Sequence, residues 1–236
     1  MKNPLHSRIF SLVLATACAL LPAQRLAAAG QEPVASIQII AFGYNSSERL
    51  VKMSDSQGTP IGSKPVGLPM NQCSALMPVP TRDLVFTPVS EGEKPTTGKP
   101  ATAHLPSTGR DFVLVFLPLP TDKGGGYMIH AVELPSDRFT SGSYAFLNYT
   151  DAEIYCGMDK QKEIVGPAKA GILSPAIAEG IVRTACFEKA GDQWAERPFF
   201  SGRLPVQRGV RNLVLVSRNV QSGQIEFRGV PDFVKN

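Results

Sequence analysis

Arg110-Asp-Phe-Val-Leu-Val-Phe-Leu117 is the stretch of sequence that decides the fold. It is a short apolar run with polar flanks, which is typical of a β-strand buried on both faces. A similar run, Arg211-Asn-Leu-Val-Leu-Val216, follows at an offset of 101 residues, with four identical and two conservative positions. The two runs indicate that one β-rich unit occurs twice in the chain.

Strand and turn signals alternate through the rest of the chain after residue 34. Val34-Ala-Ser-Ile-Gln-Ile-Ile-Ala-Phe42 is rich in β-branched residues, and Gln224-Ile-Glu-Phe-Arg228 alternates polar and apolar residues. Turn-forming clusters separate such runs at residues 54–58, 121–126, 189–192 and 221–223. The pattern predicts an all-β sandwich or barrel. Only Ser174-Pro-Ala-Ile-Ala-Glu179 predicts a short helical turn.

A second match supports the repeat. At an offset of 104 residues, Ala41-Phe42 pairs with Ala145-Phe146, and further along the chain Leu50 pairs with Ile154. A unit of about 100 residues has the usual size of an immunoglobulin-like sandwich. We therefore predict two tandem immunoglobulin-like β-sandwich units after a signal peptide. These units are residues 30–135 and 136–236.

The first 29 residues have the anatomy of an export signal. Lys2 and Arg8 form a basic start, an apolar run of 13 residues covers Ile9–Leu21, and Ala27-Ala-Ala29 offers the small residues that a signal peptidase requires. The run is too short for a membrane-spanning helix of about 20 residues. We predict a signal peptide at residues 1–29 and a periplasmic or extracellular location; a buried N-terminal helix is the alternative.

Composition and charge exclude several classes of protein. The chain is 43% hydrophobic and 19% charged, which argues against global disorder. Its 21 Gly and 20 Pro disfavour long helices and thus a coiled coil. Loss of the signal, with Lys2, Arg8 and Arg25, lowers the formal net charge from +4 to +1, so charge gives no support to a nucleic-acid partner. No second apolar run is long enough to predict a transmembrane span.

The cysteines predict one disulfide bond. Cys18 lies in the signal, where a faint lipobox leaves lipidation as an alternative; Cys73, Cys156 and Cys186 remain after its removal. Exported compartments permit disulfides. Cys156 and Cys186 lie in strand-like runs of the same half, so we predict a bond between them, which leaves Cys73 unpaired. Alternation places Cys186 on one face of its strand but does not say which face points inward.

No residue is predicted to be catalytic, to bind a cofactor or to ligate a metal. His104 follows a Pro-rich loop, His130 lies in a strand-like run, and neither has the setting of a catalytic triad. The scattered cysteines and histidines lack metal-ligand spacing. Two carboxylate pairs are available for the acid–base chemistry of a glycosidase. These pairs are Asp151 with Glu153 and Asp232 with Glu226.

Trp194 is the one residue that we single out as a possible ligand contact. It is the only tryptophan and follows a Gly-Asp turn. An exposed indole can stack on a sugar ring, whose face offers polarised C–H groups, whereas a side chain at the rim of a core is the alternative. Asn45-Ser-Ser47 and Asn148-Tyr-Thr150 fit the glycosylation sequon, but a strand-end turn role for both asparagines is the simpler interpretation.

Three stretches resemble exported, uncharacterised β-sandwich proteins of planctomycete and verrucomicrobial type bacteria. They are Gly142-Ser-Tyr-Ala-Phe-Leu-Asn-Tyr-Thr150, Ile164-Val-Gly-Pro-Ala168 and Arg211-Asn-Leu-Val-Leu-Val216, and the resemblance covers mainly residues 138–232. It implies an exported β module without catalytic residues. Periplasmic pilus-assembly chaperones are similar in size and architecture, but their paired basic anchor residues and long donor strand are not placed here, so no site residue is carried over.

These observations favour a non-catalytic exported module that binds a partner or has a structural role in the periplasm or at the cell surface. Its expected partner is an envelope protein or a glycan, with no nucleic acid. A periplasmic assembly chaperone or subunit working by β-strand donation is one alternative. A carbohydrate-active enzyme is the other.

Overall fold

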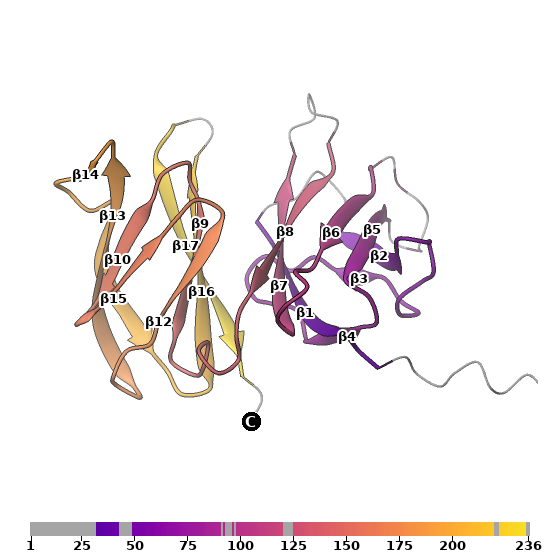
Figure 1. Cartoon of the computed structure of the whole chain (residues 1–236), viewed down its shortest axis with the longest axis horizontal. Coiled ribbons are helices and arrows are strands. Elements are labelled where there is room, and N and C mark those ends of the chain that lie inside the picture. Colours follow the sequence, from indigo (N-terminus) through magenta and orange to yellow (C-terminus); the bar gives the residue numbers. More distant parts are fainter. Residues whose placement is uncertain are drawn as a thin grey trace, which may run out of the picture. The chain divides into compact units, whose positions relative to one another are not determined.

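The computed structural model describes residues 32–42, 49–90, 92, 96, 98–119, 125–219 and 222–234. Residues 33–236 form one compact unit. All elements in the described ranges are β-strands, as Figure 1 shows, which confirms the all-β prediction. The predicted signal peptide and Cys18 lie outside the described residues.

The predicted helical turn at residues 174–179 is wrong. The described segment between β12 (Lys169–Leu173) and β13 (Gly180–Ala190) contains no helix. The amide of Gln161 explains this, because its oxygen accepts from the Ser174 N–H and its nitrogen donates to the Ser174 carbonyl. Both backbone groups are thereby satisfied without a helical turn.

The first half of the unit contains eight strands in two four-stranded sheets. Their bounds are β1 Ala35–Ala41, β2 Leu50–Asp55, β3 Val66–Gly67, β4 Met77–Val79, β5 Asp83–Val89, β6 Ala101–His104, β7 Asp111–Pro118 and β8 Tyr127–Glu133. We call the sheet with order β4-β1-β7-β8 inner sheet 1 and the sheet with order β3-β2-β5-β6 outer sheet 1.

The second half contains the remaining nine strands. Their bounds are β9 Tyr144–Tyr149, β10 Ile154–Met158, β11 Gln161–Val165, β12 Lys169–Leu173, β13 Gly180–Ala190, β14 Gln193–Trp194, β15 Phe200–Val206, β16 Val210–Arg218 and β17 Ile225–Phe233. Inner sheet 2 has the order β12-β9-β16-β17. In outer sheet 2, β11 pairs with β10, β10 pairs with β13, and β13 pairs with both β14 and β15.

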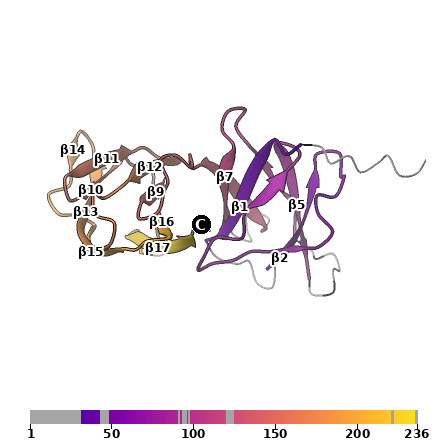
Figure 2. The same ribbon diagram turned by 90° about the horizontal axis from the view of Figure 1, so that it is seen from below.

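The two halves have the same strand order. Without β14, each strand of one half has a counterpart at the same place in a sheet of the other, and the pairs β1–β7 and β9–β16 are both parallel. Figures 1 and 2 show that no strand is exchanged between the halves. An immunoglobulin-like order is not confirmed, because that order places its first two strands in one sheet, whereas β1 and β2 lie in different sheets.

The sequence matches that suggested the repeat do not join equivalent positions. Phe112 faces the core of the first half, whereas Leu213, its partner at the offset of 101, faces away from the core of the second half. Ala41 and Ala145, matched at the offset of 104, differ in the same way. A shift of one residue exchanges the two faces of a strand. The topology therefore repeats, while these sequence matches reflect similar apolar composition.

Each half is a sandwich with its own core. In the first half, Ile37 and Phe112 of inner sheet 1 pack in one cluster with Phe86 of outer sheet 1. In the second half, Phe146 of inner sheet 2 packs in one cluster with Ile154 and Cys156 of outer sheet 2. Burial of such side chains is worth about 1.5–3 kcal/mol each and dominates the stability of a sandwich.

A third apolar cluster lies between the two inner sheets. It contains Val113 and Val115 of β7 together with Leu213 and Leu215 of β16, all of them buried. The inner sheets are therefore covered on both faces, which is why β7 and β16 have unbroken apolar runs. This confirms the prediction that residues 110–117 form a strand buried on both faces.

Gly171 of β12 marks a close approach of strands in the second half. A Cβ atom at this position would lie 2.5 Å from Val165 Cγ2 and 2.5 Å from Glu163 Cγ. We expect Gly171→Ala to destabilise the protein by about 1–3 kcal/mol through overpacking, measured by urea unfolding. Gly67→Ala is the matched control, because nothing lies within 4 Å of its added Cβ. The alanine in this control lowers the conformational entropy of the unfolded chain, so its stability should be equal to that of the unmodified protein or about 0.4–1 kcal/mol higher. Equal losses of stability in both variants would contradict the packing argument.

Candidate functional site

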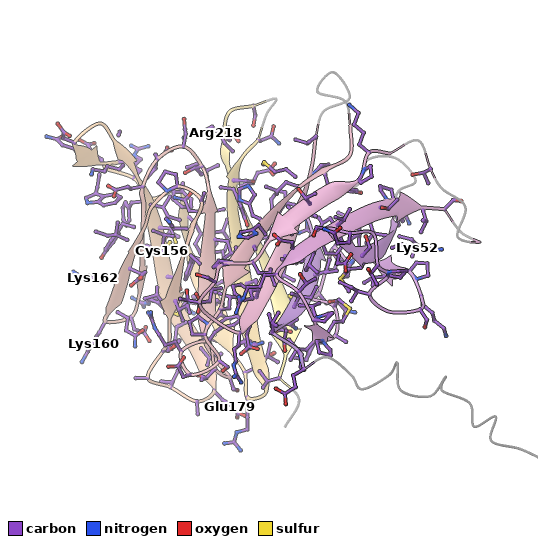
Figure 3. All side chains as sticks on the ribbon, turned by 45° about the vertical axis from the view of Figure 1, so that its right-hand side comes forward. Lys52, Cys156, Lys160, Lys162, Glu179 and Arg218 are labelled. Carbon is purple, nitrogen blue, oxygen red and sulfur yellow. The ribbon has the colours of Figure 1, made fainter. Side chains whose placement is uncertain are left out.

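Cys156 and Cys186 lie directly opposite each other on β10 and β13. Both side chains are fully buried in the core of the second half, so the face of β13 that carries Cys186 points inward. Figure 3 shows Cys156 among the strands, while Lys160 and Lys162 of the β10–β11 hairpin lie at the outside. Both cysteines are free thiols here, and a hydrogen bond with Cys186, together with burial, raises the pKa of Cys156. Their disulfide stays a prediction.

The opposite face of outer sheet 2 carries an aromatic cluster. Tyr155 and Phe187 are register partners on β10 and β13, with ring centroids 5.9 Å apart. The two-residue strand β14 pairs back onto the end of β13 and brings Trp194 to 5.7 Å from the Tyr155 ring. Trp194 is 37% exposed, so the exposure that a ligand contact requires is present.

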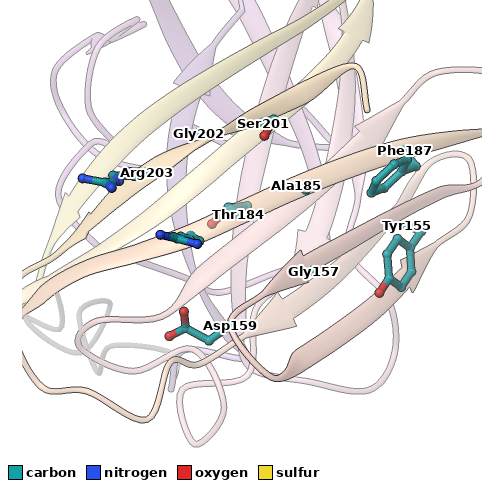
Figure 4. A pocket seen from close by; sticks show the side chains of 10 residues that line it. Tyr155, Gly157, Asp159, Thr184, Ala185, Phe187, Ser201, Gly202 and Arg203 are labelled. Atoms are coloured by element: carbon teal, nitrogen blue, oxygen red, sulfur yellow. The ribbon is translucent and has the colours of Figure 1, made fainter. Parts of the chain in front are cut away.

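A shallow trough adjoins the aromatic cluster. Gly157, Ala185 and Ser201 are consecutive register partners across β10, β13 and β15, and their small side chains leave a hollow of about 620 Å³. Tyr155 and Phe187 stand at one end of this trough in Figure 4. Large side chains in these three positions would fill the hollow, so the floor depends on this combination of residues.

The other side of the trough is charged. Arg183 of β13 and Arg203 of β15 are register partners on the exposed face, and Asp159 lies just beyond β10. Among the residues that the structure describes, none forms a side-chain hydrogen bond or ion pair with either guanidinium or with the Asp159 carboxylate. These three groups are therefore available to a ligand.

Lys189 and Glu153 border the aromatic cluster. The Lys189 Nζ atom lies 2.6 Å from Glu153 Oε2, and the hydrogen bond to Glu153 raises the pKa of Lys189. Asp151, the other acid of that predicted pair, accepts a hydrogen bond from Arg218. Both carboxylates are thus engaged with basic side chains.

The remaining candidates for catalysis are not gathered at one place. Glu226 and Asp232 lie six residues apart on β17, which corresponds to roughly 20 Å along a strand. A glycosidase pair needs about 5–9.5 Å. His104 is exposed and contacts Asp83, whereas His130 packs against the Tyr149 ring, and burial lowers the pKa of His130.

Asn148 has the predicted strand-end turn role. It is fully buried; its amide donates to the carbonyls of Ala152 and Val165, and its oxygen accepts from Thr150. Asn45 lies outside the described residues. Within the described ranges, no group of three His, Cys, Asp or Glu side chains is arranged to hold a metal ion. The same part of the chain contains no helix with the length and apolarity needed to cross a membrane.

A second hollow opens between β3 and β4, which are edge strands of the two sheets of the first half. It has a volume of about 730 Å³. Its lining is mostly apolar and includes Met53, Ile61, Val66, Leu68 and Met77.

Comparison with known proteins does not assign this arrangement to a family. No protein-family model matches the chain, and no curated protein matches it.

Sequence reasoning singled out Trp194 of the adjoining aromatic cluster and none of the residues that line the trough. Trp194 was identifiable because it is unique in the chain. Tyr155, Phe187, Arg183 and Arg203 became candidates only once the pairing of β10, β13 and β15 was known. The alternation around Cys186 divides β13 into two faces, one with Cys186 and the other with Phe187. The sequence did not show that the Cys186 face points inward, so it could not show that Phe187 lies on the outer face.

Proposed function

We propose that the protein is a non-catalytic exported binding module that recognises a glycan of the cell envelope through the trough on outer sheet 2. The observation that carries this proposal is the exposed aromatic cluster of Tyr155, Phe187 and Trp194 beside a floor of small side chains. Sugars present flat faces of C–H groups, and aromatic rings provide a surface that such faces can stack on without a deep pocket.

The position of the trough suits a binding role. Its floor lies on hydrogen-bonded strands of a packed sandwich, so the contact residues are held by the sheet. Its open, shallow form admits a section of a long chain, which an enclosed pocket would not. The predicted export signal supports an envelope glycan as the partner.

The unique tryptophan makes the proposal directly testable. Titration of the protein with soluble envelope polysaccharide fragments is expected to change the intrinsic fluorescence of Trp194, because a sugar that stacks on the indole alters its exposure to water. Calorimetry of Trp194→Ala with the same fragments should show affinity reduced roughly thirtyfold, the typical cost of truncating a central tryptophan at a binding site.

Phe233→Ala is the matched control, because Phe233 is an exposed aromatic residue of β17, away from outer sheet 2. It should bind as the unmodified protein does. Absence of binding to any fragment in the unmodified protein, or equal losses in both variants, would reject glycan recognition at this face.

The hollow between β3 and β4 supports a second candidate, in which the protein accepts a strand donated by another envelope protein. Edge strands can pair with an added strand, and the apolar lining can hold its alternate side chains. Such a complex should survive high salt and be lost in Val66→Asp, which places a charge in the lining. Affinity capture from the cell envelope with both forms tests this, and equal capture by the two would reject it.

A further inference from the structure

Arg183 and Arg203 lie opposite each other, and no ion pair with an acidic side chain of the described residues offsets their positive charges. They are direct cross-strand partners on the solvent face of outer sheet 2. Like charges directly opposite each other destabilise a sheet. Within the described part of the chain, no acidic side chain forms an ion pair with either of them. A bound anion would relieve this repulsion, whereas water and salt only screen it.

The surrounding residues add to the positive charge. Lys162 of β11 is the register partner of Gly157, and it is exposed at the edge of the trough floor. Asp159 is the one acid that lines the trough. The trough and its edge therefore carry three positive groups, two guanidinium and one ammonium, and one carboxylate.

We propose that the glycan bound in the trough is acidic, with an anionic group held by Arg183 and Arg203 while a sugar ring stacks on the aromatic cluster. This inference rests on the proposed function and specifies its ligand. Guanidinium groups bind carboxylates through two parallel hydrogen bonds, and two of the terminal oxygens of a sulfate ester can accept such a pair as well. The shared chemistry is thus an anion attached to a sugar.

The separation of the two sides defines the size of the ligand. Phe187 and Arg183 lie four residues apart on the same face of β13, which corresponds to about 13 Å. This is longer than one sugar ring, so the ligand that contacts both sides is an oligosaccharide. In the trough, the Asp159 carboxylate can accept hydrogen bonds from sugar hydroxyl groups, and the Ser201 hydroxyl can donate or accept them.

The experiment compares two forms of one oligosaccharide. Binding of oligogalacturonate to the full chain is measured by calorimetry, together with binding of the same oligosaccharide after reduction of its carboxyl groups to alcohols. The acidic form should bind at least about tenfold more tightly, and its affinity should fall with added salt. Dextran sulfate, with neutral dextran as its reference, forms a second arm and tells whether the preferred anion is a carboxylate or a sulfate.

Arg203→Gln and Arg183→Gln should each lower affinity for the acidic form by about tenfold and leave the affinity for the neutral form unchanged. Arg110→Gln, an exposed arginine of the first half, is the control and should change neither. Trp194→Ala should weaken both forms, which separates stacking from charge recognition.

The outcomes distinguish this inference from the proposed function. Equal binding of acidic and neutral forms in both arms would overturn the acidic ligand while glycan recognition stands. An acidic preference that persists unchanged in both arginine variants would also overturn it. No binding of any form would instead count against the proposed function itself.

Discussion

Replacement of Arg211 by alanine is expected to destabilise the folded protein by about 3–5 kcal/mol, because it leaves a buried carboxylate without its counter-ion. Arg211 Nε lies 2.6 Å from Asp232 Oδ2, and the Asp232 side chain is only 6% exposed. Gln38 Nε2 donates to the other carboxylate oxygen over 2.9 Å. A chemical unfolding curve measures the loss of free energy.

The same arginine links the two halves of the unit. Gln38 belongs to β1 of the first half, and its side-chain oxygen accepts a hydrogen bond from Arg211 of β16. The Arg211 guanidinium also lies over the Phe139 ring at 4.5 Å and donates to the Phe139 carbonyl over 2.8 Å. Its loss therefore removes several hydrogen bonds at once beside the third apolar cluster.

Two variants make the expectation falsifiable. Arg208→Ala removes an arginine whose ion-pair partner Glu179 is largely exposed, so its loss should cost no more than about 1 kcal/mol. The double variant Arg211→Met with Asp232→Leu removes both buried charges and should recover most of the stability that Arg211→Ala loses. If Arg211→Ala lost no more stability than Arg208→Ala, the buried ion pair would stabilise the protein no more than an exposed pair does.

The unbroken apolar runs gave the most reliable structural predictions from the sequence. Residues 110–117 predicted a strand buried on both faces, and β7 lies between two apolar clusters. The run at 34–42 became β1, its parallel neighbour. These predictions succeeded because burial on both faces leaves a local signature, namely an apolar run that lacks alternation.

The strand order could not be predicted from the same runs. Pairing of β1 with β7 joins Ile37 to Phe112, and no local feature of either strand specifies so distant a partner. The sequence match at the offset of 101 suggested that these positions are equivalent, yet Phe112 and Leu213 face different clusters. Apolar strands share composition, so letter matches cannot fix the register to one residue.

The trough shows the same limit at the level of the site. Residues that lie side by side in the trough come from different strands. For example, Gly157 of β10 pairs with Ala185 of β13, and Ala185 pairs with Ser201 of β15. None of these residues is unusual by itself, and small residues in strands have many roles. Trp194 was found because its rarity is visible without any pairing information.

Cys156 and Cys186 have backbone geometry that suits a disulfide bond. Hydrogen bonds from Asp159 N to Arg183 O and from Lys189 N to Glu153 O fix the alternation of the β10–β13 ladder. Hydrogen-bonded and non-hydrogen-bonded pairs alternate along the ladder, so Cys156 and Cys186 form a non-hydrogen-bonded pair. In such a pair the Cα atoms lie about 4.5 Å apart and the side chains are closest. Bridged cysteines usually have Cα atoms about 4.4–6.8 Å apart.

We therefore expect the protein, when it folds in an oxidising compartment, to contain a Cys156–Cys186 bond. It should then be about 3–4 kcal/mol more stable than its reduced form, since the bond closes a loop of about 30 residues in the unfolded chain. Urea unfolding with and without reductant measures the difference. Alkylation of the unfolded, non-reduced protein should label Cys73 alone.

Cys73→Ser is the control for the choice of partner. Cys73 lies in the first half, and burial raises the pKa of its thiol, which disfavours the reactive thiolate. This variant should keep the full effect of reductant, whereas Cys156→Ala with Cys186→Ala should lose it. Labelling of all three cysteines in unfolded, non-reduced protein that folded in an oxidising compartment would show that Cys156 and Cys186 stay reduced, and would contradict the predicted bond.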